Sequence, residues 1–182
     1  MELLDYERRR DNKYSDMFSG FKRSLPQISI FHHPSSPPSI QALALLRNAL
    51  SSPYPPGKPS ALPLEFDLEV VETKPPTADQ LRTILTYITP PRSTAPPALS
   101  AFLSAHPASP GLGEQPQSVK GIVSLAERNP NVFKWPVVVD WNGGRASVGD
   151  VEGVRAILEA IRQQRDGEVK QDEVDQPKGW FS

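Results

Sequence analysis

The chain has 182 residues, a formal net charge of −1, 37% hydrophobic and 23% charged residues, which is typical of one globular domain with short extensions. A net charge so close to zero argues against binding to nucleic acid or to a membrane surface, and no stretch approaches the roughly 18 consecutive apolar residues of a membrane span. Proline occurs 21 times and cysteine does not occur, so disulfides, cysteine-bound metals and thiol chemistry by the chain itself are excluded.

Residues 1–25 are expected to form a flexible N-terminal arm. Acidic and basic side chains are mixed up to Asp16, whereas no Asp or Glu occurs between Met17 and Leu64. From residue 17 the stretch "MFSGFKRSLP" is basic and acid-free and contains Ser and Phe, which is typical of a mitochondrial targeting segment; an ordinary arm is the alternative. Met17 is therefore expected to be an alternative or true start, and a mature end upstream of it would contradict this.

The first predicted strand covers residues 27–31, where Ile-Ser-Ile-Phe lies between Pro26 and Pro34. A helix is expected to follow, with either Ser36 or Ser39 as its N-cap. The helix is predicted from apolar residues that recur at helical spacing: Ile40, Leu43, Leu46 and Leu50.

Residues 51–63 are rich in proline and are expected to form a loop. The next nine residues, 64–72, alternate apolar and acidic side chains, which predicts a strand with one buried face. A second helix is expected to begin after Thr77, which forms a capping box with Gln80, and to end before Pro90. The face of the strand that we expect to be buried carries Leu64, Phe66, Leu68 and Val70.

Two further helices are expected in the middle of the chain, a short one over residues 97–105 and another between Ser118 and Asn129. The third strand, residues 137–139, is Val-Val-Val, which indicates a strand covered on both faces.

The end of the chain reads as a hairpin followed by a helix. Asn142-Gly143 is expected to supply the positive backbone angles of the turn, and the chain returns as a strand over residues 145–149. Asp150 caps the last predicted helix. Residues 166–182 have no apolar period and are expected to form a loose tail.

The order of these elements predicts an α/β, thioredoxin-like sandwich over residues 26–165. The strand-helix-strand unit makes the first two strands parallel, and the hairpin adds two antiparallel strands to give a four-stranded mixed sheet. The helices of residues 97–129 form an insertion between the second and third strands.

Three motifs carry a resemblance to the arsenate-reductase branch of the thioredoxin-like superfamily: "ISIFHHPSSPPS", "ETKPPTADQLRTIL" and "WPVVVDWNGGRASVGD". Within that branch the chain resembles a family of small fungal mitochondrial proteins that are described as redox proteins. The resemblance implies an oxidoreductase located in mitochondria, with a cytoplasmic location as the alternative. It places Ser36 where the branch has its reactive cysteine, Trp135 where an arginine precedes the hairpin proline, and Arg92 in a place comparable to an arginine of the oxyanion site.

The candidate ligand-binding residues are Ser36, Ser39, His33, Trp135, Pro136 and Arg92, and no catalytic or metal-binding residue is predicted. The positive end of a helix with free N–H groups can hold an anion, to which the serine hydroxyls would add donors. The alternative is that both serines are helix caps and His33 is a solvated loop residue. A serine nucleophile needs an oriented base, and no acidic residue between Met17 and Leu64 could orient a histidine.

The Trp135-Pro136 bond is expected to be cis, because the resemblance places it beside the reactive turn, where backbone groups pair with an extended substrate. Trp135 would then form an apolar wall for a ligand. His106 is expected to be an ordinary surface residue.

Two functions remain open from the sequence. One is a mitochondrial thioredoxin-like redox protein, without thiol chemistry of its own. The other is a redox-inactive binding module that holds a small anion, glutathione or an extended peptide at the Ser36/Pro136 cleft. No cofactor, nucleic-acid partner or membrane insertion is expected, and the sequence predicts no oligomeric state.

Overall fold

The computed structural model describes residues 24–89, 98–111 and 113–168. Most of the expected N-terminal arm, with its targeting segment, and most of the expected C-terminal tail lie outside the described residues. The elements between them follow the predicted order, with strands and helices in the sequence β-α-β-α, an insertion, and β-β-α.

The centre of the fold is a four-stranded mixed sheet in the order β2-β1-β3-β4. Strand β1 pairs with β2 in parallel and with β3 in antiparallel register, and β3 pairs with β4 as a hairpin. This strand order and these directions confirm the predicted thioredoxin-like fold. The strands are β1 (Gln27–His32), β2 (Asp67–Glu72), β3 (Val137–Asp140) and β4 (Arg145–Val148).

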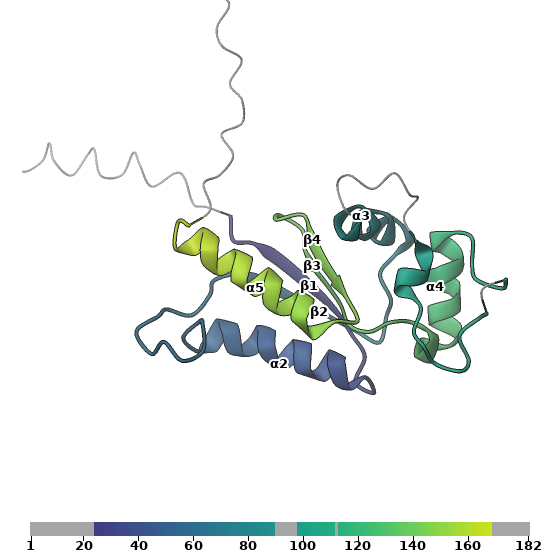
Figure 1. Ribbon diagram of the computed structural model, residues 1–182, viewed down its shortest axis with the longest axis horizontal. Coiled ribbons are helices and arrows are strands. Elements are labelled where there is room, and N and C mark those ends of the chain that lie inside the picture. Colours follow the sequence, from purple (N-terminus) through teal and green to yellow (C-terminus); the bar gives the residue numbers. More distant parts are fainter. Residues whose placement is uncertain (1–23, 90–97, 112, 169–182) are drawn as a thin grey trace, which may run out of the picture.

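Helices cover both faces of the sheet (Figure 1). Helices α2 (Pro37–Ser51) and α5 (Val151–Arg165) lie side by side and pack on Ile28, Ile30 and Val138. The other face, formed by Phe31 and by Val137 and Val139, is covered by α3, α4 and two short 3-10 turns. These are α3 (Ala78–Ile88), α4 (Val119–Arg128), η1 (Leu99–Phe102) and η2 (Pro130–Val132).

The predicted helix starts are confirmed. Thr77 and Gln80 form the capping box of α3, with both reciprocal hydrogen bonds present. Ser118 accepts a hydrogen bond from the Gly121 amide at the start of α4, and Asp150 accepts two from the first turn of α5. Each cap satisfies amides that have no partner inside the helix, so the sequence signal has a direct physical cause.

Two element boundaries differ from the prediction. The strand expected over residues 64–72 begins at Asp67, whose amide donates to the Pro26 carbonyl, and Val70 is 38% exposed. Strand β2 lies at the edge of the described sheet and pairs with one strand, so its side chains are more exposed to solvent than the alternating pattern implies. The helix expected over residues 97–105 is a single 3-10 turn, η1, of which residue 97 lies outside the described residues.

The β3–β4 turn differs in detail. The positive φ angle lies at Gly144, at +63°, and not at Asn142 or Gly143. The Asp140 side chain closes the turn instead, because it accepts from the Gly143 amide at 2.8 Å and from Arg145 at 3.0 Å. In the described part of the chain, no helix is long and apolar enough to cross a membrane, and no cluster of three metal-binding side chains occurs.

A cluster of ion pairs at the C-terminus of α5 makes the free energy of unfolding depend on pH in the acidic range. Hydrogen bonds from Arg165 and then Arg162 lower the pKa of Asp166, and a hydrogen bond from Arg162 lowers the pKa of Glu168. The contribution of these two carboxylates to the free energy of unfolding is therefore complete above their ordinary pKa values of 3.8 and 4.5. It is lost as the pH falls through their lowered pKa values in the folded protein. We expect Arg162→Gln to flatten the loss of stability below this range, measured by urea unfolding at successive pH values. Arg155→Gln, which breaks an exposed pair on the same helix, should leave the profile unchanged.

Candidate functional site

In the turn between β1 and α2, the backbone amides at the start of the helix are either bonded within the turn or absent because the residue is proline. Ser36 is the N-cap of α2, and its own amide donates to the His33 carbonyl at 3.0 Å. Pro37 and Pro38 occupy the first two helical positions and have no N–H, while the Ser39 amide donates to the Ser36 carbonyl at 3.0 Å. The expectation that free N–H groups at this helix end hold an anion is therefore wrong.

Ser39 is a buried structural residue and not an N-cap. Its side chain is fully buried, and its hydroxyl accepts from the His33 amide at 3.0 Å and lies 2.8 Å from His32 Nδ1. Because the hydroxyl oxygen already accepts from His33, its hydrogen is available to the His32 ring. Ser39 thus ties the end of β1 to the first turn of α2.

Ser36, at the start of α2, lies next to Trp135, which is in the segment that leads into β3. Its hydroxyl donates to the Trp135 carbonyl at 3.5 Å, the long limit of a hydrogen bond, and it makes no cap bond within its own helix. The Trp135-Pro136 peptide bond is cis, as predicted. The structure therefore brings Ser36 beside the residue that precedes this proline.

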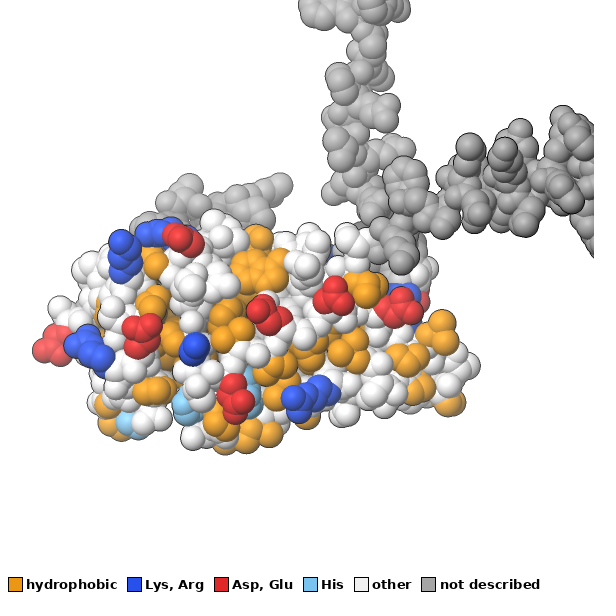
Figure 2. Space-filling view, turned by 180° about the vertical axis from the view of Figure 1, so that it is seen from behind, with side chains coloured by type: hydrophobic (Ala, Val, Ile, Leu, Met, Phe, Trp, Pro, Cys, Tyr) orange, Lys and Arg blue, Asp and Glu red, His pale blue; other side chains and the backbone are white. Residues whose placement is uncertain are grey.

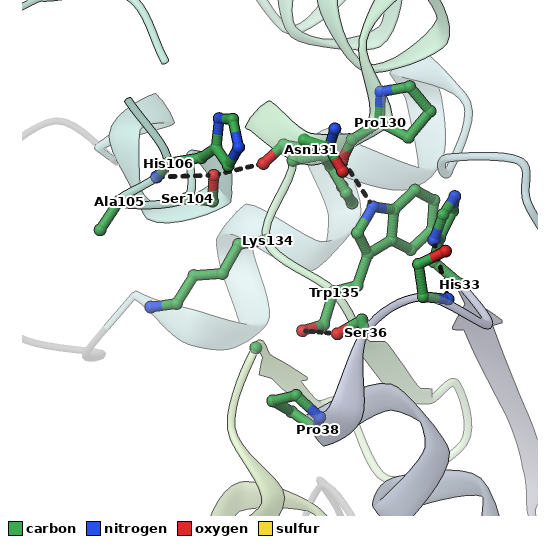
Figure 3. A pocket seen from close by; sticks show the side chains of 13 residues that line it. His33, Ser36, Pro38, Ser104, Ala105, His106, Pro130, Asn131, Lys134 and Trp135 are labelled. Atoms are coloured by element: carbon green, nitrogen blue, oxygen red, sulfur yellow. Dashed lines mark hydrogen bonds between the residues drawn. The ribbon is translucent and has the colours of Figure 1, made fainter. Parts of the chain in front are cut away.

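Trp135 is buried and makes contacts on several sides. It is 6% exposed, and its indole N–H donates to the Pro130 carbonyl at 2.9 Å. Its ring packs edge-on against Phe133, with centroids 4.8 Å apart, and lies 5.4 Å from the His33 ring. Trp135 and His33 together form one wall of a cleft (Figure 3).

This cleft has a volume of about 410 Å³ and lies between the start of α2, the segment after η1, and the segment from η2 to β3. Figure 3 shows Lys134 extending from the floor toward Ala105, with Trp135 and His33 at the opposite end. Among the lining residues in the described part of the chain there is no carboxylate. They are His33, Ser35, Ser36, Pro38, Ser104, Ala105, His106, Pro130, Asn131, Phe133, Lys134, Trp135 and Gly149. Ser39 and Pro136 do not line it, and Arg92 lies outside the described residues.

The polar residues at the Ala105 end were not predicted. The Ser104 hydroxyl donates to the Asn131 carbonyl at 2.6 Å and accepts from the His106 amide at 3.2 Å, which joins the two segments into one wall. His106 is exposed, as expected, but it lines the cleft. Its place in a proline-rich stretch gave no sign of this.

The histidines that line the cleft, His33 and His106, are not oriented as bases for a serine nucleophile, because the Nδ1 of each accepts from a nearby backbone amide. His33 Nδ1 accepts from the Ser35 amide at 3.3 Å, and His32 is engaged by Ser39. Within the described ranges neither imidazole is hydrogen-bonded to a carboxylate. Ser36 can therefore donate to or accept from a ligand, but it is not activated for attack.

Comparison with known proteins identifies the family. The family described as "Protein of unknown function (DUF1687)" matches residues 18–149. The chain belongs to this family. The matched range contains the β1–α2 turn, the cis proline and the walls of the cleft, so the family match spans the whole candidate site.

Other comparisons are less informative. No curated protein matches the chain. A solved structure described as arsenate reductase from Vibrio cholerae is 17% identical, with a TM-score of 0.46, and the match covers 75% of this chain and 98% of that chain. The fold assignment rests on the strand order and register of the sheet itself.

The surface seen from behind carries no large patch of one charge (Figure 2). Acidic and basic side chains are scattered among hydrophobic ones, and histidine side chains gather toward one end of this face. In the cleft the local balance of charge is positive, because Lys134 has no acidic counterpart among the described lining residues.

Proposed function

We propose that this protein is a redox-inactive thioredoxin-fold binding module. Its cleft would hold an extended, peptide-like small molecule, of which glutathione is the simplest thiol-bearing example. The observation that carries the proposal is a cleft beside the cis proline that has the buried Trp135 ring as one wall and Lys134 and Ser36 among its lining residues. The resemblance places Ser36 at the position of a reactive cysteine, which this chain lacks.

Two features of the cleft support an extended ligand over a compact anion such as phosphate or arsenate. Pro37 and Pro38 remove the amides that would surround a compact anion at the helix start. From the described residues the Trp135 carbonyl, in contrast, accepts only the long bond from Ser36, which a ligand N–H group could replace.

The binding proposal is tested with S-methylglutathione, whose blocked thiol prevents oxidation. Saturation-transfer NMR is expected to show transfer from the protein to this probe. Ala105→Trp, which fills the cleft from an exposed position, should abolish the transfer, while Ala44→Trp on the exposed face of α2 should preserve it. Absence of transfer at millimolar probe, or equal transfer to both variants, would contradict the proposal.

The oxidoreductase function implied by the resemblance is tested by the rate at which glutathione reduces a small disulfide in the presence of the protein. Thiol–disulfide exchange proceeds through a thiolate, and this chain has no cysteine. We expect reduction of a small disulfide by glutathione to proceed at the same rate with and without the protein. A faster rate with the protein would establish that it acts on a bound thiol, and the binding module would then be an enzyme.

We also propose a mitochondrial location, supported by the resemblance and by the acid-free segment after Met17. The structure does not describe this segment. Fractionation of cells followed by N-terminal sequencing of the native protein tests the proposal, and a cytoplasmic protein that begins at Met1 would contradict it.

A further inference from the structure

Lys134 is the one formally charged side chain among the described residues that line the cleft. It forms no ion pair with any carboxylate of the described ranges, and in Figure 3 its side chain extends away from His33 toward the Ala105 end. The cleft therefore has an aromatic end and a cationic end.

The position of Lys134 is constrained by its neighbours. Its amide donates to the Phe102 carbonyl at 2.8 Å, which fixes the backbone. Its aliphatic stem lies directly on Gly149, where an added methyl group would overlap the lysine side chain. Gly149 is itself held by a 2.6 Å hydrogen bond from its amide to the Pro136 carbonyl. The stem therefore has a packing partner on one side, while Lys134 as a whole is exposed to solvent.

The rest of the cleft offers a backbone acceptor and an aromatic wall. The Trp135 carbonyl lies beside Ser36 and accepts its long hydrogen bond, while the Trp135 and His33 rings form the wall at a mutual tilt of 35°. Because Lys134 and Trp135 are consecutive along the floor, a ligand in extended conformation can meet both an acceptor for its N–H and a cation for its terminus.

We propose that the cleft recognises the free C-terminal carboxylate of an extended peptide-like ligand, and that Lys134 is the residue that binds this carboxylate. The inference rests on the proposed binding function and names its ligand class. Asn131, which is exposed and also lines the cleft, carries an amide donor as well. A single ammonium with an amide donor suits a monoanionic carboxylate, which needs fewer donors than a phosphate group.

The test compares two probes that differ only at this terminus. Dissociation constants are measured by ligand-observed NMR for S-methylglutathione and for its glycine amide. The wild-type protein is expected to bind the amide about two to five times more weakly, the upper part of the range for one exposed charged contact. Lys134→Gln should bind both probes with the affinity that the wild type has for the amide, and Lys134→Arg should retain the preference for the carboxylate.

Lys120→Gln is the matched control, because Lys120 is an exposed lysine on α4 that does not line the cleft. It should preserve the preference, and equal losses in the Lys120 and Lys134 variants would overturn the inference by showing a general effect of charge. Equal binding of both probes by the wild type would overturn the carboxylate inference and leave the binding function standing. Failure of both probes to bind would overturn the binding function itself.

Discussion

Replacing Ser39 with alanine is expected to lower the free energy of unfolding by about 1–3 kcal/mol, because it leaves the His32 ring nitrogen buried without its partner and the part-buried His33 amide without an acceptor. Urea unfolding followed by tryptophan fluorescence measures this change. We expect the variant to lose ligand binding as well, since the His33 backbone carries the ring that packs on Trp135.

Ser36→Ala is the control for this prediction, because it changes the same residue type three positions earlier in the same turn. Among the described residues the Ser36 hydroxyl makes one hydrogen bond, at 3.5 Å, so its loss should cost less than about 0.5 kcal/mol. Equal destabilisation by the two substitutions would show that Ser39 is not the anchor of the turn.

Replacing Ser36 with cysteine is expected to create a reactive thiol in a chain that has none. The N-terminus of α2 should lower the thiol pKa from the ordinary value of about 8.5 by roughly one unit. A larger shift is not expected, because Pro37 and Pro38 provide no N–H donors to the thiolate. The pH dependence of alkylation by iodoacetamide measures this pKa.

Ser52→Cys supplies the matched comparison, because Ser52 is the C-cap of the same helix and lies at its negative end. A thiol there should titrate at or above the ordinary pKa. Identical pKa values for the two thiols would show that the helix start has lost the electrostatics of a thiol site, and the turn would then be only a structural connection.

Much of the fold could be predicted because its signals are local. Thr77 and Gln80 form hydrogen bonds that the first turn of a helix requires, so their spacing predicts where α3 begins. The apolar run of Val137 to Val139 predicts a strand that is buried on both faces. Val70 was predicted wrongly because its exposure depends on β2 being an edge strand, which is a property of the whole sheet.

Only the side of the candidate site that is formed by the β1–α2 turn and Trp135 could be predicted from the sequence. His33, Ser36 and Trp135 stand in motifs whose spacing indicates where the chain turns, and the structure brings them together. Ser104, His106 and Asn131 come from irregular segments without period or motif, and their contacts with one another are tertiary. The missing amides, in contrast, could have been predicted from Pro37 and Pro38, because proline has no N–H wherever it occurs.

Ser36 and Ser39 show why residue type alone does not assign a role. Both are serines at the start of the same helix, yet one faces the cleft and the other is buried beneath it. Which of them turns inward depends on the helix phase, which places Ser39 against His32 at the end of β1.

The most direct test of the cleft as a ligand site is a titration of the isotope-labelled protein with S-methylglutathione, followed by amide and indole chemical shifts. The account predicts saturable shifts at Ser35, Ser36, Lys134 and the Trp135 indole, with the outer face of α5 unchanged. Shifts confined to residues outside the cleft, or no shifts at millimolar probe, would contradict it.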